Sequence, residues 1–140
     1  MATGTAASDT VKARLNQARV LVVDDSDQIR EALQVMLESA GFTVVGTANR
    51  GEDGVDLALA LAPDVVLMDF RMSGIDGVEA TRRIKEVNPL IEVVILTADD
   101  DPALSKRAVE VGVFSTLSKD SSPSVIAEVI TRALGHGRPG

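Results

Sequence analysis

The chain has 140 residues, a length that suits one folded domain and leaves little room for a second. Apolar residues make up 45% of it, enough for a buried core, but only 2% are aromatic, so we expect an aliphatic core without an aromatic stacking platform. The formal net charge of −7 argues against direct nucleic-acid contact by this domain, and the lack of cysteine excludes disulfides and thiolate metal sites.

No apolar run approaches the roughly 20 residues that a membrane-spanning helix needs. Residues 1–10 lack the basic and then apolar pattern of a signal peptide, so we expect a cytoplasmic protein without a membrane segment. We predict a flexible leader at 1–17, a folded domain at 18–135 and a flexible tail at 136–140. The single histidine, His136, falls in the tail and gives little support to a zinc site.

Short apolar runs alternate with segments of helical periodicity along the rest of the chain. In chain order we expect a strand at 19–23, a helix capped by Ser26 or Asp27 and followed by Gly41, a strand at 43–48, a helix at 52–62, a strand at 65–68, a helix at 77–87, a strand at 91–96, a helix at 102–111, a strand at 113–117 and a helix from Pro123 to Gly135.

The character of these strands predicts how they are arranged. The first, third and fourth are apolar without alternation, as strands are when both faces of a sheet are covered. Repeated strand–helix–strand units imply parallel strands with right-handed crossovers. We therefore predict an α/β fold: a doubly wound five-stranded parallel sheet of flavodoxin-like order 2-1-3-4-5, flanked by five helices.

Polar side chains end four of the expected strands. Asp24 and Asp25 follow the first strand, Asp69 the third and Thr97 the fourth, and Lys119 lies just after the fifth. In a doubly wound sheet the ligand site lies beyond the carboxyl ends of the strands, where the strand order reverses, here between the first and third strands. We therefore expect these five side chains to converge at one edge of the sheet.

Each of these residues also has a plainer interpretation: the aspartates as turn or cap residues, Thr97 as a strand residue and Lys119 as a solvated surface residue. Together, however, three carboxylates at one edge repel one another unless a cation lies between them, and Mg²⁺ is the hard cation that suits carboxylates, water and phosphate oxygens. Asp69 is then a candidate nucleophile at the end of a buried strand. Lys119 supplies positive charge for a transferring phosphoryl group.

Several stretches carry a resemblance to a known family. They resemble the receiver domains of two-component response regulators over residues 19–134, in order, spacing and placement at strand ends. The stretches are Val20-Leu21-Val22-Val23-Asp24-Asp25-Ser26, the run from Pro63 to Met72 with Asp69 inside it, Asp76-Gly77, Ile95-Leu96-Thr97-Ala98 and Leu117-Ser118-Lys119-Asp120.

The resemblance implies a flavodoxin/CheY-like fold and a phosphoacceptor that depends on Mg²⁺. Asp69 matches the residue that takes the phosphoryl group. Asp24 and Asp25 match the acidic pair that holds Mg²⁺, joined by Asp69 and by the backbone carbonyl of Arg71.

The resemblance also implies roles for Thr97 and Lys119, and this sequence differs from the usual receiver pattern at two positions. Thr97 and Lys119 match the residues that contact the phosphoryl group and pass its arrival to the rest of the domain. Where receivers often carry an aromatic switch partner, three positions before the lysine, this chain has Thr116. Phe114, two residues earlier on the same expected strand face, is interpreted as a packing aromatic or a substitute. The loop after Asp69 has Ser73 where a proline is common.

The implied partners are a sensor histidine kinase or phosphotransfer protein as donor, and a downstream protein or an output domain outside this chain as target. A phosphorylation-dependent homodimer is a further expectation. Chemistry is expected to stop at self-catalysed phosphotransfer and autodephosphorylation. Three alternatives remain. One is a receiver-like module that is never phosphorylated, which the intact acidic set disfavours and Thr116 leaves open. The others are a Mg²⁺-dependent phosphatase with an Asp nucleophile, which Arg71 two residues after Asp69 disfavours, and a flavodoxin-like cofactor carrier, which the lack of Tyr and Trp disfavours.

Overall fold

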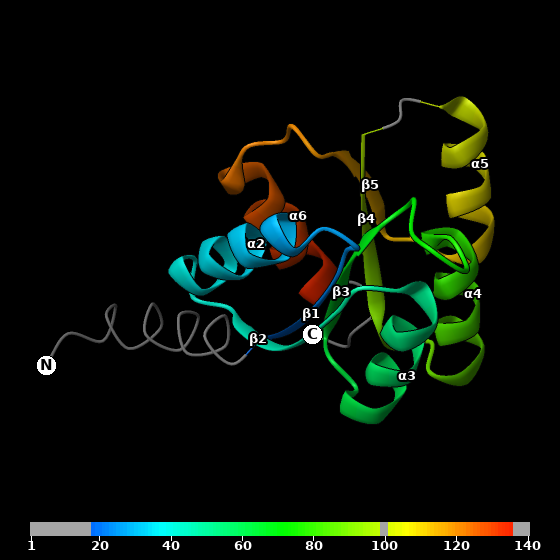
Figure 1. Ribbon diagram of the computed structural model, residues 1–140, viewed down its shortest axis with the longest axis horizontal. Helices are drawn as coiled ribbons and strands as arrows, with labels where there is room; N and C mark the ends of the chain where they lie inside the picture. Colours follow the sequence, from blue (N-terminus) through cyan, green and yellow to red (C-terminus); the bar gives the residue numbers. More distant parts are fainter. Residues whose placement is uncertain (1–17, 99–100, 136–140) are drawn as a thin grey trace, which may run out of the picture.

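The computed structural model of the protein describes residues 18–98 and 101–135 (Figure 1). The predicted leader at 1–17 and the predicted tail at 136–140, with His136, lie outside the described residues. Strand and helix alternate as β1 (Arg19–Val23), α2 (Asp27–Ser39), β2 (Thr43–Ala48), α3 (Gly51–Leu61), β3 (Val65–Asp69), α4 (Gly77–Val87), β4 (Glu92–Thr97), α5 (Pro102–Val111), β5 (Ser115–Ser118) and α6 (Pro123–Gly135).

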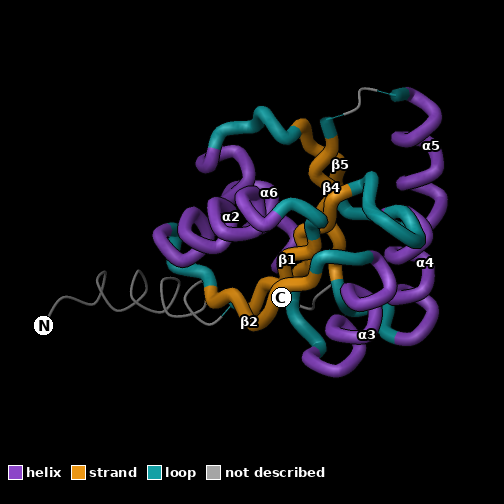
Figure 2. The backbone as a smooth tube through the Cα atoms, in the orientation of Figure 1, coloured by secondary structure: helices purple, strands orange, loops and turns teal. Residues whose placement is uncertain are grey.

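The five strands form one parallel sheet in the order β2-β1-β3-β4-β5, which confirms the predicted fold. Helices α2 and α6 cover one face of this sheet, and α3, α4 and α5 cover the other (Figures 1 and 2). The strand order reverses between β1 and β3, because β1 pairs with β2 on one side and with β3 on the other.

The core consists of two apolar layers, one on each face of the sheet. Along β1, Leu21 and Val23 pack toward α3, α4 and α5, whereas Val20 and Val22 pack toward α2 and α6. All four side chains are at most 1% exposed. The strand is therefore apolar at every position because both of its faces are covered, as the absence of alternation predicted.

Side-chain caps set the starts of several helices, α6 among them, where Ser122 accepts a hydrogen bond from the N–H of Val125 at 3.3 Å. Ser26 caps α2 by accepting a hydrogen bond from the backbone N–H of Ile29 at 3.3 Å, which decides between the two predicted caps in favour of Ser26. Asp76 caps α4 through the N–H of Glu79, and Asp101 caps α5 in the same way with Pro102 at its first turn.

The last strand begins two residues later than predicted. Val113 is still tied to α5, because its N–H donates to the carbonyl of Ala108 at 3.0 Å, and Gly112 before it has a φ of 92°. Strand pairing starts at Ser115, which lies opposite Val94. Val113 therefore belongs to the hydrogen-bonded end of α5, although its apolar side chain had led us to place it in the strand.

Helix α3 and strand β4 also differ slightly from their predicted bounds. The helix runs from Gly51 to Leu61, one residue earlier at each end, and stops at Ala62, whose left-handed φ of 47° ends it before Pro63. Strand β4 begins at Glu92 rather than at the preceding isoleucine. Within residues 18–98 and 101–135, no helix combines the length and the apolar character that crossing a bilayer requires.

Candidate functional site

The carboxyl ends of four strands bring the predicted side chains to one edge of the sheet. Asp24 directly follows β1, Asp69 ends β3, Thr97 ends β4, and Lys119 directly follows β5. The register keeps these ends level, since Asp69 lies opposite Leu96 and the residue before Lys119 lies opposite Thr97. The expected convergence at this edge is confirmed.

Asp24 is the most deeply buried of these groups, at 1% exposure. Its Oδ1 accepts a hydrogen bond from the N–H of Ser26 at 2.9 Å, and its Oδ2 lies 3.0 Å from the Nζ of Lys119. The guanidinium of Arg30 donates to the Asp24 backbone oxygen at 2.7 Å and also pairs with Asp27. Sequence reasoning missed Arg30, because a contact with a backbone carbonyl leaves no signal in residue spacing.

Asp69 is 6% exposed, and its Oδ1 lies 3.1 Å from the Nζ of Lys119. Burial raises the pKa of Asp69, and repulsion from Asp24 raises it further, while the hydrogen bond and the charge of Lys119 oppose both effects. Burial acts to lower the pKa of Lys119, but its contacts with Asp24 and Asp69 outweigh burial, so that pKa is raised and the ammonium stays charged.

The acidic residues have the arrangement of a cation site. Asp24, Asp25 and Asp69 each offer a carboxylate oxygen, and these oxygens all lie within 4.8 Å of one another. Oxygens bound to Mg²⁺ at about 2.1 Å lie roughly 3 to 4 Å apart, so the three carboxylates are already close to the spacing that such a site needs. Three carboxylates and one ammonium leave two negative charges, which one divalent cation neutralises.

The segment after Asp69 is folded tightly against the start of α4. The N–H of Gly77 donates to the carbonyl of Phe70 at 2.8 Å. A Cβ at Gly77 would meet the Asp69 backbone oxygen closer than non-bonded atoms can approach. Gly77 therefore lets the helix start directly beside the candidate nucleophile. Arg71 lies in this segment, and the ligand role of its backbone carbonyl stays a prediction.

Thr97 and Thr116 line a hollow of about 340 Å³ between β4, α5 and β5. Thr97 is buried, with 6% of the residue exposed. Its backbone oxygen accepts a hydrogen bond from the N–H of Lys119 at 2.9 Å. Phe114 does not share this hollow: it precedes β5 and packs in the apolar layer beneath α2 and α6. The interpretation of Phe114 as a packing aromatic is correct, and its expected placement on the Thr116 face is wrong because β5 starts later.

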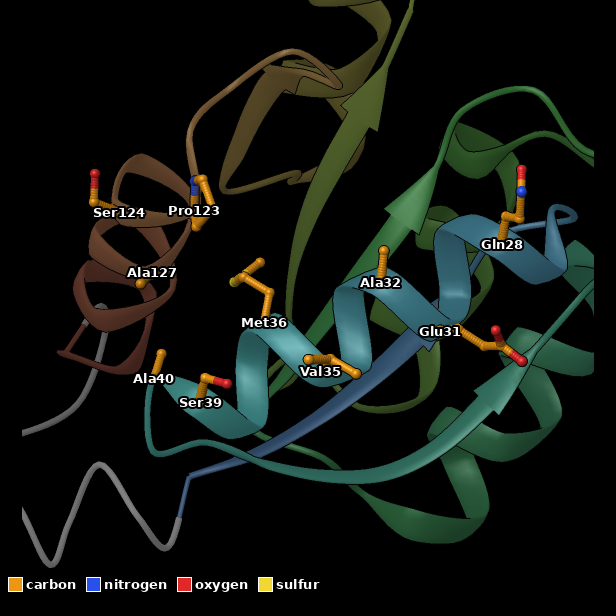
Figure 3. Close-up of a pocket in the computed structure, with 10 residues that line it drawn as sticks. All are labelled: Gln28, Glu31, Ala32, Val35, Met36, Ser39, Ala40, Pro123, Ser124 and Ala127. Atoms are coloured by element: carbon orange, nitrogen blue, oxygen red, sulfur yellow. The ribbon is translucent and has the colours of Figure 1, made fainter.

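A larger groove lies away from the acidic edge, between α2 and α6 (Figure 3). It has a volume of about 870 Å³ and is bordered by apolar side chains such as Val35 and Met36. The five converging strand-end residues do not line it, so it is separate from the candidate site.

The family of the chain follows from comparison with known proteins. Residues 20–131 match the model of one family, the response regulator receiver domain. Because this match covers most of the chain and agrees with the sheet order and the acidic edge, the chain belongs to the response regulator receiver domain family. It is therefore a signalling domain of two-component systems.

Individual relatives agree with this family. The transcriptional regulatory protein LiaR of Bacillus subtilis is 40% identical over 122 residues, which are 86% of this chain and 57% of LiaR. The chain thus spans little more than half the length of the curated relatives it matches.

Solved structures show the same fold. A LuxR-family two-component response regulator from Aurantimonas sp. superposes with a TM-score of 0.82 at 30% identity, over 87% of this chain and 88% of that one. The CheX–CheY–BeF3–Mg²⁺ complex from Borrelia burgdorferi contains a chain that superposes with a TM-score of 0.78 at 25% identity, over 82% of this chain and 87% of that one.

Proposed function

We propose that this receiver domain accepts a phosphoryl group on Asp69 in a reaction that depends on Mg²⁺, and that this changes its contacts with a partner. The observation that carries the proposal is the position of Lys119, whose ammonium lies 3.0 Å from Asp24 and 3.1 Å from Asp69 at the same edge of the sheet. A single positive charge between two buried carboxylates is suited to a transferring phosphoryl group.

In the proposed step, a carboxylate oxygen of Asp69 attacks the phosphorus of a phosphohistidine. A P–O bond forms as the P–N bond breaks, and the electron pair of that bond stays on the imidazole nitrogen. Lys119 holds its charge beside the phosphoryl oxygens, and Thr97, at the end of the neighbouring strand, offers a hydroxyl to them. Catalysis is then mostly positioning and electrostatic stabilisation by the chain's own residues.

Asp24, Asp25, Asp69 and the Arg71 carbonyl would hold the metal. Mg²⁺ bound there supplies positive charge to the phosphoryl oxygens and relieves the repulsion among the carboxylates. The raised pKa of Asp69, caused first by burial and then by Asp24, supports this fit, because a cation bound beside the carboxylate would favour its charged form. The structurally similar CheX–CheY complex from Borrelia burgdorferi, which contains BeF3 and Mg²⁺, also supports the proposal of a phosphoryl group and Mg²⁺ at this site.

The proposed donor is a sensor histidine kinase or a phosphotransfer protein. The proposed target is a downstream protein or an output domain of a longer chain, with a phosphorylation-dependent homodimer as one form of response. We further propose that the domain works in the cytoplasm, makes no direct nucleic-acid contact and turns over no external substrate.

The test is phosphoryl uptake measured by intact-protein mass spectrometry after incubation with Mg²⁺ and a small phosphodonor. Wild-type protein gains the mass of one phosphoryl group, and a chelator prevents the gain. Asp69→Asn gains nothing, whereas Asp56→Asn, an exposed carboxylate on α3, behaves as wild type. Undiminished uptake by Asp69→Asn, or uptake that ignores the chelator, contradicts the proposal.

A further inference from the structure

The ring of the residue next to the candidate nucleophile has two arginines close to it. Phe70 follows Asp69 directly and is 8% exposed. The guanidinium carbon of Arg71 lies 5.5 Å from the centre of the Phe70 ring, and that of Arg107 lies 5.9 Å from it. Both distances are in the range of cation–π attraction. Arg107 belongs to α5, so a helix far along the chain contacts the segment that leaves β3.

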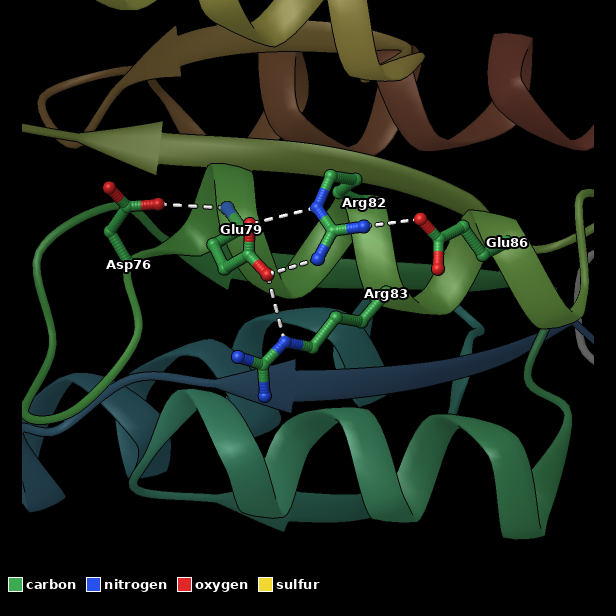
Figure 4. Close-up of polar contacts among 5 residues, drawn as sticks. All are labelled: Asp76, Glu79, Arg82, Arg83 and Glu86. Atoms are coloured by element: carbon green, nitrogen blue, oxygen red, sulfur yellow. Dashed lines mark hydrogen bonds and ion pairs between the residues drawn. The ribbon is translucent and has the colours of Figure 1, made fainter.

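Arg107 also holds the other end of this segment. Its Nη2 lies 3.1 Å from Oδ2 of Asp76. The other carboxylate oxygen of Asp76 caps α4 by accepting from the N–H of Glu79 at 2.8 Å, as Figure 4 shows. One guanidinium on α5 therefore contacts both Phe70, where the segment begins, and Asp76, where it ends.

The segment between these contacts is tied to the backbone of Asp69. The N–H of Gly77 donates to the Phe70 carbonyl at 2.8 Å, which closes the segment on itself. Gly77 also packs against the backbone oxygen of Asp69 too closely for a Cβ. A shift of the Asp69 backbone therefore reaches Phe70 and Asp76, and through them Arg107.

We propose that Arg107 is a positioning residue that couples the Asp69 site to the placement of α5, through its joint contacts with Phe70 and Asp76. The inference rests on the proposed function, because it gives the phosphoryl site a route to a helix on the protein surface.

The contacts limit how strong the coupling can be. The side chains of Arg107 and Asp76 are 48% and 31% exposed, so their ion pair is weak and screened by salt. The stacked guanidinium adds a contribution of similar size. We expect a coupling factor of about three to ten between ligand binding at Asp69 and the position of α5, around the lower limit of the roughly 5- to 150-fold range typical of allosteric effects.

The experiment is amide hydrogen exchange of the full chain, with and without Mg²⁺ plus beryllofluoride as the phosphoryl mimic. In wild-type protein the ligand changes exchange in peptides covering 70–76 and in peptides covering α5. In Arg107→Ala the α5 response falls by at least about threefold, while the 70–76 response persists. Arg107→Lys, which keeps the charge but loses the planar stacking group, has an intermediate α5 response.

A second variant removes the ion pair without removing the helix cap. Asparagine caps helices as well as aspartate does, so Asp76→Asn keeps α4 and should reproduce the loss of the α5 response. Arg132→Ala is the matched control, since it deletes an arginine and its surface pair with Glu128 on α6. This control keeps the full α5 response.

The outcomes separate the two proposals. A full α5 response in both Arg107→Ala and Asp76→Asn overturns the coupling by Arg107 and leaves the phosphoacceptor proposal intact. An absence of beryllofluoride binding by wild-type protein overturns the phosphoacceptor proposal and the coupling with it. An equal loss in Arg132→Ala shows that any lost surface arginine has this effect, which also overturns the specific role of Arg107.

Discussion

The ammonium group of Lys119 lies 3.1 Å from Oδ1 of Asp69, joining the end of β5 to the end of β3. The side chains are only 22% and 6% exposed, so the pair is largely removed from water. The same ammonium lies 3.0 Å from Asp24. The positive charge of Lys119 therefore offsets the repulsion between the carboxylates of Asp24 and Asp69.

Replacing Lys119 by methionine should separate stability from metal binding. Without the ammonium, two largely buried carboxylates lose their partner, and we expect a loss of about 1–3 kcal/mol of unfolding free energy in the presence of a chelator. Mg²⁺ binding should become tighter because the site gains a net negative charge, while phosphoryl uptake slows. Urea unfolding and Mg²⁺ titration measure the two effects. Lys106→Met, at an exposed position on α5, is the control, and weaker Mg²⁺ binding by Lys119→Met contradicts the electrostatic account.

Asp69 should make the protein less stable as the pH rises. Burial and then Asp24 raise its pKa in the native state above the ordinary value of 3.8, so the native state binds this proton more tightly than the unfolded state does. Between about pH 4 and the raised pKa, unfolding releases the proton, and the free energy of unfolding falls with increasing pH. Asp69→Asn lacks this titration, so it should gain stability relative to wild type across that window without metal.

The measurement is urea unfolding of wild-type protein and Asp69→Asn in a chelator, at several pH values from about 4 to 7. The difference between the two curves isolates Asp69 from the other carboxyl groups. Added Mg²⁺ should remove most of the difference at neutral pH. A stability difference that is constant with pH argues that the native pKa of Asp69 is not raised.

Asp25 should act in metal binding and contribute little to folding. It is exposed, yet its carboxylate lies with those of Asp24 and Asp69 in one cluster. At a Mg²⁺ concentration of 100 times the dissociation constant, binding stabilises a protein by about 2.7 kcal/mol. Asp25→Asn should keep wild-type stability in a chelator and lose most of the Mg²⁺-induced rise in melting temperature. Asp56→Asn should keep that rise, and a full rise in Asp25→Asn would remove Asp25 from the metal site.

The sheet order and the site were predictable because few physical choices were open. Strands that are apolar at every position, such as β1 and β3, must be covered on both faces, and helices between them force a parallel sheet. Parallel strands place their carboxyl ends at one edge, so Asp24, Asp69 and Lys119 had to meet there. Side-chain chemistry narrowed the cap of α2 to Ser26 or Asp27, and the structure shows that it is Ser26.

What could not be predicted depends on contacts that leave no mark in the apolar pattern of the sequence. The late start of β5 follows from the hydrogen bond of Val113 to the end of α5, which an apolar pattern cannot reveal. Arg107 meets Asp76 across 31 residues, and an arginine on a helix surface gives no signal of its partner. Phe114 was misplaced for the same reason as β5, since its expected face assumed that the strand had already begun.

Gly77 offers a test of how closely α4 must approach the acceptor. A Cβ at this position would collide with the backbone oxygen of Asp69 and lie 3.1 Å from the Cγ of Met68, both in the buried part of the site. Gly77→Ala should therefore destabilise the domain by about 1–3 kcal/mol and weaken Mg²⁺ binding, because the segment after Asp69 must shift. Gly135→Ala is the matched control: nothing lies within 4 Å of its added Cβ, so α6 should be unchanged or slightly more stable. Urea unfolding and Mg²⁺ titration of both variants decide the point, and a Gly77→Ala protein with wild-type stability and metal affinity would show that the contact is not required.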